Sequence, residues 1–326
     1  MNLDKDKKLE LFDLRYPQES FTKNYIPKGL GKTDKDSLKK LLSGKKFAAA
    51  NIHFYSTASS ALSYFIESLS IKNHEICTLG GNVFESLAMT KTISTDPDLW
   101  QDTELKDIKL FIWSHPNLLS GEYLPQLYFE RAYKILRQIN PDAYILIDQR
   151  SHSICWEHVG PGMWDKSVQS DGKVAILDST EPVLAPSKFK QLSWLKAKNT
   201  KLSDKCFHTE EDLAKVFYVM ASYKSMQGSI SEELHRKTLV ARESLKRISN
   251  QFLRENAKVT VWPAAGYFLK LSFENELEAK RFQQRFESLN VKLMNGAAYG
   301  DNTNLYLSYA MHLSQVDRLL KLLTKS

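Results

Sequence analysis

The sequence predicts an α/β protein with a doubly wound, mostly parallel sheet and a second, smaller α+β lobe. Two continuous apolar strands, at 109–113 and 143–148, flank an amphipathic helix at 127–139. Such strand–helix–strand alternation is typical of a buried parallel sheet with helices on both faces. After a long helix at 232–256 the pattern changes to short strands mixed with helices. This change predicts the smaller lobe.

Length and charge limit the class of protein. The 326 residues suffice for one large α/β unit plus a smaller one. The net charge of +7 comes from Lys and Arg residues scattered among Asp and Glu. That pattern favours anionic small molecules over nucleic acid as partners. The charged N-terminus lacks an apolar signal region, and no stretch of about 18 apolar residues occurs. We therefore expect a cytoplasmic protein without a membrane partner.

The three cysteines, Cys77, Cys155 and Cys206, are far apart and odd in number. Their spacing matches neither a metal site nor a disulfide framework. We expect free thiols and no bound metal.

Residues 1–45 are polar except for a compact apolar island at 11–17. They predict an extended arm followed by a short helix around 36–42. So few apolar residues cannot form a core alone, so the arm should pack against another part of the chain.

The stretch from Tyr55 to Leu62 is rich in small hydroxyl residues and leads into apolar residues at helical spacing. Small residues at a helix start let backbone N–H groups approach an anion, and the helix dipole adds to the attraction. An ordinary helix cap is the alternative explanation. A strand at 75–79 follows, and Phe84 stands at the start of the next expected helix.

The remaining elements follow from apolar patterning. A strand is expected at 174–178, and further helices at 210–225, 276–289 and 313–324. The strands of the smaller lobe are expected at 259–262, 267–271, 291–294 and 305–309. The chain contains no internal repeat and no low-complexity segment.

Four polar residues stand at or just past predicted strand ends: Asp148, His115, Asn117 and Lys188. In doubly wound sheets, ligands bind at the carboxyl ends of the strands. The convergence predicts a ligand site there. An aspartate that ends an apolar strand can also be a simple turn residue.

Lys188 is the candidate nucleophile. The apolar run 182–186 ends in Ser187-Lys188, and a second cation, Lys196, lies eight residues further on. Apolar surroundings and a neighbouring cation both lower a lysine pKa, which makes the amine more nucleophilic. The alternative is a solvated basic loop.

The order of these pieces, from about residue 50 to the end, resembles the fold-type I aminotransferases that use pyridoxal phosphate (PLP). The group concerned is class I/II, which includes histidinol-phosphate aminotransferase. The segments 144–148 and 186–188 resemble the family's aspartate strand and Ser-x-Ser-Lys block. The segments 262–269 and 290–300 are similar to two small-domain motifs and occur in the same order.

The resemblance implies the PLP-transferase fold type I and a role for each matching residue. Lys188 would form the Schiff base, and Asp148 would keep the pyridine nitrogen protonated so that the ring accepts electrons. Phe84 would stack on the ring, with His115 or Asn117 near its oxygen. The phosphate would be held by Ala58, Ser59, Ser187 and Lys196.

The resemblance also implies domains and partners. Residues 46–235 would form the large PLP-binding domain, and residues 1–45 and 236–326 the small domain with its arm. A homodimer is expected, with the arm reaching the other subunit. The substrates would be an amine or amino acid and an oxo acid, and the sequence does not identify them.

Several positions depart from the family pattern. Aligned on Gly121, the family's ring-oxygen asparagine becomes Leu118. The tyrosine after the aspartate becomes Ser151, and the arginine that holds the substrate carboxylate becomes Tyr306. Lys196 replaces the phosphate-binding arginine, which keeps the charge but loses the bidentate geometry. A different alignment places Ser179-Thr180-Glu181 at the lysine block, and then no catalytic lysine exists.

Two functions follow, from different classes. The first is a PLP-dependent transferase of aminotransferase type, acting through a Lys188 Schiff base. The second is a degenerate aminotransferase-like protein that has lost catalysis and serves as a binding or assembly partner. The missing arginine matters because a substrate carboxylate without a cation is costly to desolvate. An unrelated α/β enzyme is a third, weaker possibility.

Overall fold

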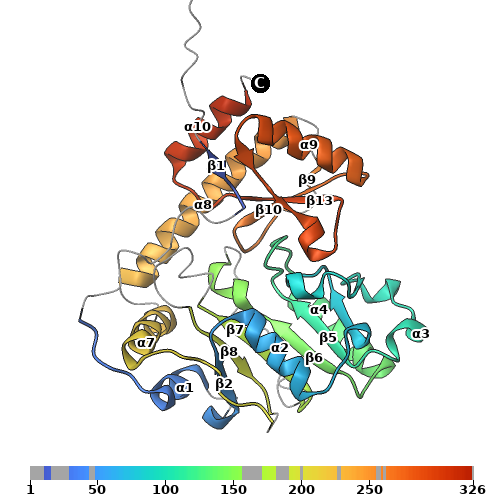
Figure 1. The fold of residues 1–326 in the computed structure, drawn as a ribbon, viewed down its shortest axis with the longest axis vertical. Helices are drawn as coiled ribbons and strands as arrows, with labels where there is room; N and C mark the ends of the chain where they lie inside the picture. Colours follow the sequence, from blue (N-terminus) through green and yellow to red (C-terminus); the bar gives the residue numbers. More distant parts are fainter. Residues whose placement is uncertain are drawn as a thin grey trace, which may run out of the picture.

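The chain folds into two lobes, stacked along the long axis of the molecule (Figure 1). The computed structural model describes residues 11–15, 29–43, 48–155, 171–180, 191–198, 201–225, 229–254, 258–259 and 262–324. A seven-stranded sheet organises the large lobe, and a four-stranded sheet organises the small lobe.

The large sheet has the strand order β2-β8-β7-β6-β5-β3-β4. Its strands are β2 (Ile52–Tyr55), β3 (Ile76–Leu79), β4 (Lys91–Ile93), β5 (Leu110–Ser114), β6 (Tyr144–Asp148), β7 (Val174–Ser179) and β8 (Ser193–Lys196). The pairs from β4 to β7 are all parallel, whereas β8 is antiparallel to both neighbours. The prediction of a mostly parallel seven-stranded sheet is confirmed.

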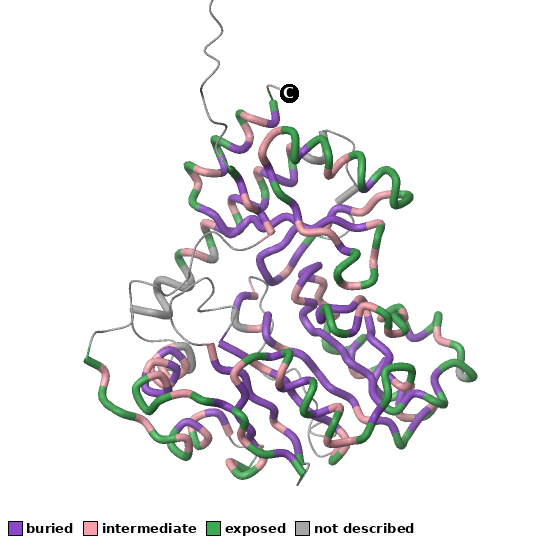
Figure 2. The backbone as a smooth tube through the Cα atoms, viewed as in Figure 1, coloured by how far each residue is buried: buried purple, intermediate pink, exposed green. Residues whose placement is uncertain are grey.

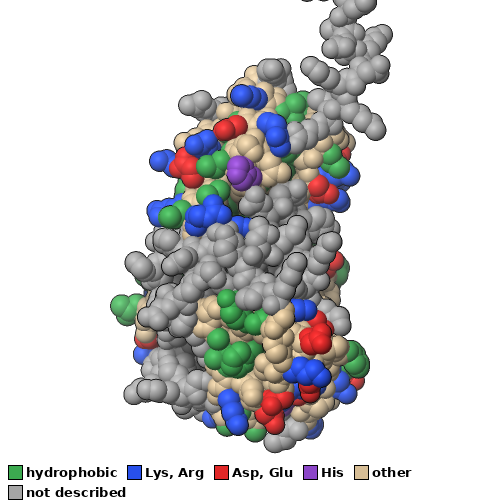
Figure 3. Space-filling view, turned by 90° about the vertical axis from the view of Figure 1, so that its left-hand side faces the viewer, with side chains coloured by type: hydrophobic (Ala, Val, Ile, Leu, Met, Phe, Trp, Pro, Cys, Tyr) green, Lys and Arg blue, Asp and Glu red, His purple; other side chains and the backbone are tan. Residues whose placement is uncertain are grey.

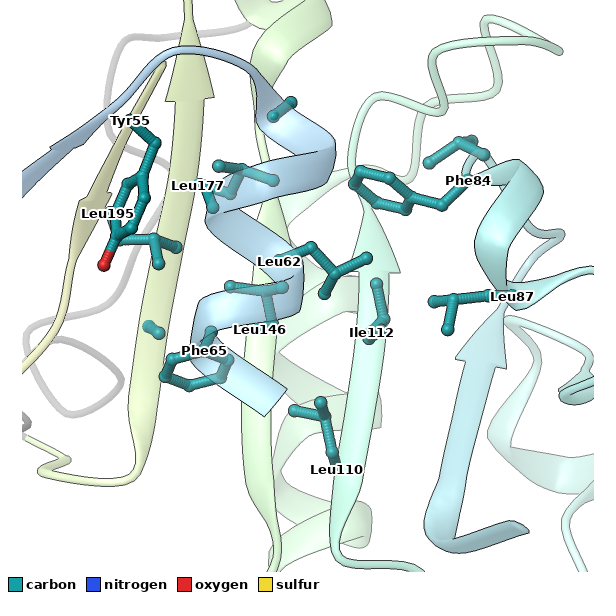
Figure 4. Close-up of a cluster of buried hydrophobic side chains, with 14 of the residues drawn as sticks. Tyr55, Leu62, Phe65, Phe84, Leu87, Leu110, Ile112, Leu146, Leu177 and Leu195 are labelled. Atoms are coloured by element: carbon teal, nitrogen blue, oxygen red, sulfur yellow. The ribbon is translucent and has the colours of Figure 1, made fainter. Parts of the chain in front are cut away.

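Helices cover both faces of this sheet. On one face lies α2 (Ala58–Ser68), whose Leu62 and Phe65 are buried in one cluster with Leu146 and Leu177 of the strands (Figure 4). On the other face lies α4 (Gln126–Ile139), whose buried side chains pack against the alternate strand residues. The edge strand β4 is largely exposed, whereas the central strands β3, β5, β6 and β7 are buried along nearly their whole length (Figure 2). Such burial explains why they are continuous apolar runs in the sequence.

The helix α1 (Lys35–Ser43) packs with α7 (Glu210–Ser225) against the β2–β8 side of the large sheet. Leu38 and Leu42 are buried in one cluster with Trp194 of β8. The expected boundary at residue 45 assigns α1 to the small domain, whereas in the structure α1 packs against the large lobe. The reason is the apolar face of α1, which is buried against the large lobe.

The small lobe has the strand order β12-β13-β10-β9. Its strands are β9 (Lys258–Val259), β10 (Phe268–Ser272), β12 (Met294–Asn295) and β13 (Asn304–Ser308). Its helices are α9 (Glu276–Ser288), α10 (Leu313–Leu323) and part of α8 (Ser229–Arg254), which runs from one lobe to the other (Figure 1). A short parallel pair joins β1 (Phe12–Asp13) to β11 (Val291–Lys292). This pair attaches the N-terminal arm to the small-lobe core, where Phe12 and Leu14 are buried.

Charges of both signs are mixed on the face drawn in Figure 3, where Lys and Arg side chains lie among Asp and Glu. No helix in the described part of the chain combines the length and apolarity needed to cross a bilayer. The three cysteines are free thiols, as predicted.

Candidate functional site

The carboxyl ends of β2, β3, β5, β6 and β7 meet at one edge of the large sheet, because these strands run in the same direction. Register places Ser114 of β5 directly beside Asp148 of β6. The Ser114 hydroxyl donates to Oδ2 of Asp148 at 3.3 Å. Polar side chains therefore gather where the fold class predicts a ligand site.

The Asp148 carboxylate is completely buried and forms a bidentate ion pair with Arg150. Nε of Arg150 donates to Oδ1, and Nη2 donates to Oδ2, both at 2.9 Å. The Arg150 backbone N–H also donates to Oδ1, at 3.2 Å. Two parallel N–H donors match the two oxygens of a carboxylate, which is the strongest geometry for this pair. Arg150, which no sequence motif singles out, is thus the principal partner of Asp148.

Phe84 contacts the same guanidinium. Cζ of Arg150 lies over the Phe84 ring, 4.6 Å from the ring centroid. Phe84 is buried in the cluster that α2 forms with the sheet, close to the arrowhead of the strand that carries Ile112 (Figure 4). It precedes a short 3-10 turn at Glu85–Leu87, where a longer helix was expected. The guanidinium therefore donates to the carboxylate and lies over the phenyl ring.

Asn82 holds Phe84 in this position. Its Oδ1 accepts from the Phe84 N–H at 3.0 Å, and its Nδ2 donates to the Phe84 carbonyl at 2.7 Å. Nδ2 also reaches the carbonyl of Tyr299 in the small lobe, at 3.3 Å. The sequence signal is an Asn in a Gly-Gly-Asn turn, a residue that commonly bonds the backbone two positions on.

Asn117 lies at the same edge, but its side chain stabilises its own loop. Oδ1 accepts from the N–H groups of Leu119 and Ser120, at 3.0 and 2.9 Å. Nδ2 donates to the Gly80 carbonyl at 3.4 Å. The structure gives Asn117 a turn-forming role in this arrangement.

His115 lies on the opposite face of the sheet from Asp148. Its ring packs beside Trp113 and Phe129, and its Nε2 accepts from the Leu124 N–H at 3.1 Å. Burial lowers the pKa of His115 to about 4, so the ring is neutral at pH 7. One residue of strand alternation after Ser114 accounts for the change of face.

Lys196 is also on the opposite face. Its Cα pairs with those of Ile52 and Ile176, whose side chains belong to the clusters on that face. It lowers the pKa of Asp178, which burial raises to about 7. Because β8 is antiparallel to its neighbours, its last residue, Lys196, pairs with Ile52 at the amino end of β2 and lies away from the start of α2, where it was expected to help hold the phosphate.

Ala58 and Ser59 form the first turn of α2, at the same sheet edge as Asp148. Thr57 caps the helix: its hydroxyl accepts from the Ser60 N–H at 3.0 Å, and Ser60 Oγ accepts from the Thr57 N–H at 3.1 Å. The helix cap and the anion site, the two explanations of this stretch, are therefore compatible. The start of α2 is capped, and it also lies at the sheet edge where the fold class predicts a ligand.

Of the positions that depart from the family pattern, Ser151 and Tyr306 are buried and Leu118 is partly buried. The hydroxyl of Ser151 donates to the carbonyl of Pro116. Tyr306 of β13 and Leu118 pack in or against the cluster that contains Phe84. Burial raises the pKa of Tyr306, so its hydroxyl is neutral and supplies no charge for a carboxylate.

Ser187 and Lys188 lie outside the described residues, so their positions relative to Asp148 are not given. The described residues on either side of that connection are Thr180 and Gln191, and the hydroxyls of Ser179 and Thr180 donate to the Leu192 carbonyl. Within the described ranges, no group of three or more His, Cys, Asp or Glu side chains is placed to hold a metal ion.

Comparison with solved structures settles the fold. An aminotransferase from Staphylococcus aureus superimposes with a TM-score of 0.73 at 14% identity, covering 99% of this chain and 97% of that chain. The chain has the aminotransferase fold. The aromatic aminotransferase of Pyrococcus horikoshii gives a TM-score of 0.71 at 13% identity, covering 97% and 95%. The aspartate aminotransferase of Thermotoga maritima gives 0.68 at 14% identity, covering 97% and 92%. No protein-family model and no curated protein sequence matches the chain.

The PLP ring would have to make two contacts at this edge of the large sheet. The pyridine nitrogen would need an Asp148 oxygen, and the ring would need the face of Phe84. Arg150 occupies both oxygens and that face. The residues at this edge, as arranged, do not fit the cofactor ring.

Proposed function

We propose that this chain is a non-catalytic protein of the aminotransferase fold that serves as a binding or assembly partner. The observation that carries the proposal is the position of Arg150. Its guanidinium donates hydrogen bonds to both oxygens of Asp148 and lies over the ring of Phe84, the two residues expected to hold the pyridine ring.

The free energy needed to separate Arg150 from Asp148 favours an arrangement in which the two remain paired. The Arg150 and Asp148 side chains are 5% and 0% exposed, so neither charge is solvated once the pair opens. Breaking a buried pair leaves an uncompensated charge and costs about 3–5 kcal/mol. A cofactor ring would have to supply that free energy before it gained any contact of its own. The neutral Tyr306 at the expected substrate-carboxylate position also supports a non-catalytic protein.

Absorbance spectroscopy tests the proposal. Purified wild-type protein incubated with PLP should develop no visible band that borohydride reduction removes. A borohydride-sensitive band that is lost in Lys188→Ala would contradict the proposal and establish the enzyme. Lys198→Ala is a suitable control, because it removes a nearby lysine of the same chain.

A second candidate function remains a PLP-dependent transferase acting on an amine or amino acid and an oxo acid through Lys188. The observation in its favour is that Asp148, Phe84 and the start of α2 lie at one sheet edge. It requires Arg150 to leave Asp148 when the cofactor binds. The homodimer and the cytoplasmic location also remain predictions, and gel filtration tests the first of them.

A further inference from the structure

Asp148 and Phe84 together form a site that binds a cation. Asp148 ends β6 and presents two buried oxygens, and Phe84, fixed by Asn82, presents a ring face. One flat cation contacts both: its Nε and Nη2 donate to the carboxylate oxygens, and its Cζ lies over the ring. That cation belongs to the same chain, two residues beyond the aspartate.

The geometry selects for shape as well as charge. Two parallel N–H donors in one plane satisfy both carboxylate oxygens at once, and a flat cation also stacks on an aromatic face. An ammonium group is a compact, strongly hydrated point charge, and it lacks two parallel N–H donors in one plane. Guanidinium and amidinium ions meet all of these requirements.

We propose that Arg150 is a tethered ligand of a planar-cation site formed by Asp148 and Phe84, and that the site accepts free guanidinium or amidinium ions when Arg150 is truncated. The inference rests on the proposed function for its premise that Arg150 is the resident occupant. It adds the chemical class of ligand that the site takes.

Chemical rescue tests this inference. Arg150→Ala leaves Asp148 buried and unpaired, so the melting temperature should fall by about 5–10 °C. Methylguanidinium or acetamidinium, at millimolar concentration, should restore much of that loss in a saturable manner. Methylammonium at equal ionic strength should not. If Arg150→Ala fails to fold on expression, the same selectivity should appear in its refolding yield from urea.

Two matched variants isolate the site. Arg131→Ala removes an arginine from an ion pair with Asp98 whose side chains are 50% and 62% exposed, and it should show no rescue. The double variant Arg150→Ala/Asp148→Asn removes the buried charge and should also show none. Equal responses of Arg150→Ala and Arg131→Ala, or equal effects of methylguanidinium and methylammonium, would overturn the inference.

The two proposals fail separately. A Lys188-dependent visible band in wild-type protein with PLP would contradict the non-catalytic function without affecting the rescue. Equal rescue by methylguanidinium and methylammonium would contradict the planar-cation site and would leave the absorbance result unchanged.

Discussion

Asp148, the last residue of β6, and Phe84, in the connection after β3, contact the same guanidinium. Asp148 accepts two side-chain hydrogen bonds of 2.9 Å from Arg150, and Phe84 lies 4.6 Å from its central carbon. Each residue therefore depends on the other through Arg150. The first two predictions follow from this dependence.

Asp148→Asn removes the carboxylate and leaves the Arg150 charge without its buried partner. The free energy of unfolding should fall by about 3–5 kcal/mol, as for other buried pairs with one partner removed. Urea unfolding followed by circular dichroism measures the change. Asp98→Asn breaks the exposed pair with Arg131 and should cost less than about 1 kcal/mol. Similar losses in both variants would contradict the special role of Asp148.

Asn82→Ala removes the two hydrogen bonds that fix the backbone of Phe84. Because the Phe84 N–H is buried, the loss should be about 1–3 kcal/mol, with a weaker near-ultraviolet signal from the aromatic residues. Asn302→Ala is the control, since its amide bonds only to exposed Glu276. An unchanged stability in Asn82→Ala would show that packing alone holds Phe84.

His115 gives the protein a pH-dependent stability. Its pKa is lowered by burial to about 4, against about 6.5 in an unfolded chain. Between these values the unfolded state binds more protons, so the free energy of unfolding falls as pH falls from about 6.5 to about 4. The contribution amounts to about 3 kcal/mol.

The variant His115→Gln should therefore show a flatter dependence of unfolding free energy on pH over this range. The exposed His74 provides the matched variant, and His74→Gln should keep the wild-type slope. The prediction fails when the slope in His115→Gln equals that of the wild type.

Gly121→Ala should destabilise the contact between the lobes. Gly121 has φ +66°, and an added Cβ would lie 2.3 Å from Cβ of Pro263 and 2.4 Å from the Ala265 carbonyl oxygen. Conformational strain and backbone displacement together should cost about 2–4 kcal/mol in urea unfolding. Gly172→Ala, where nothing lies within 4 Å, should change stability by less than about 0.5 kcal/mol. Equal effects at both glycines would exclude this contact as the cause.

Much of the large sheet could be predicted because its central strands are buried on both faces. Strands β3, β5, β6 and β7 are continuous apolar runs, a pattern that exposed segments rarely have. The expected strand at 291–294 is divided into β11 and β12, and the expected strand at 259–262 lies partly outside the described residues. Strands β2 and β8 were not predicted, because they are short and include polar residues such as His53 and Lys196.

The candidate site was less predictable, because side-chain direction depends on alternation within each strand. Asp148 lies at the expected edge, whereas His115 and Lys196 point to the opposite face. The sequence does show Arg150 two residues after Asp148. However, the contact of its guanidinium with Phe84 brings together segments that are far apart in the chain, and no local sequence pattern predicts such a contact.

The buried pair of Asp148 and Arg150 has a consequence for how this chain could change over evolutionary time. A substitution at either position alone exposes the fold to a buried, uncompensated charge. The two positions are therefore expected to vary together among relatives, in an order that avoids the unpaired intermediate. In any relative that binds a cofactor ring at Asp148, we expect a residue other than arginine at position 150, because Arg150 bonds both carboxylate oxygens.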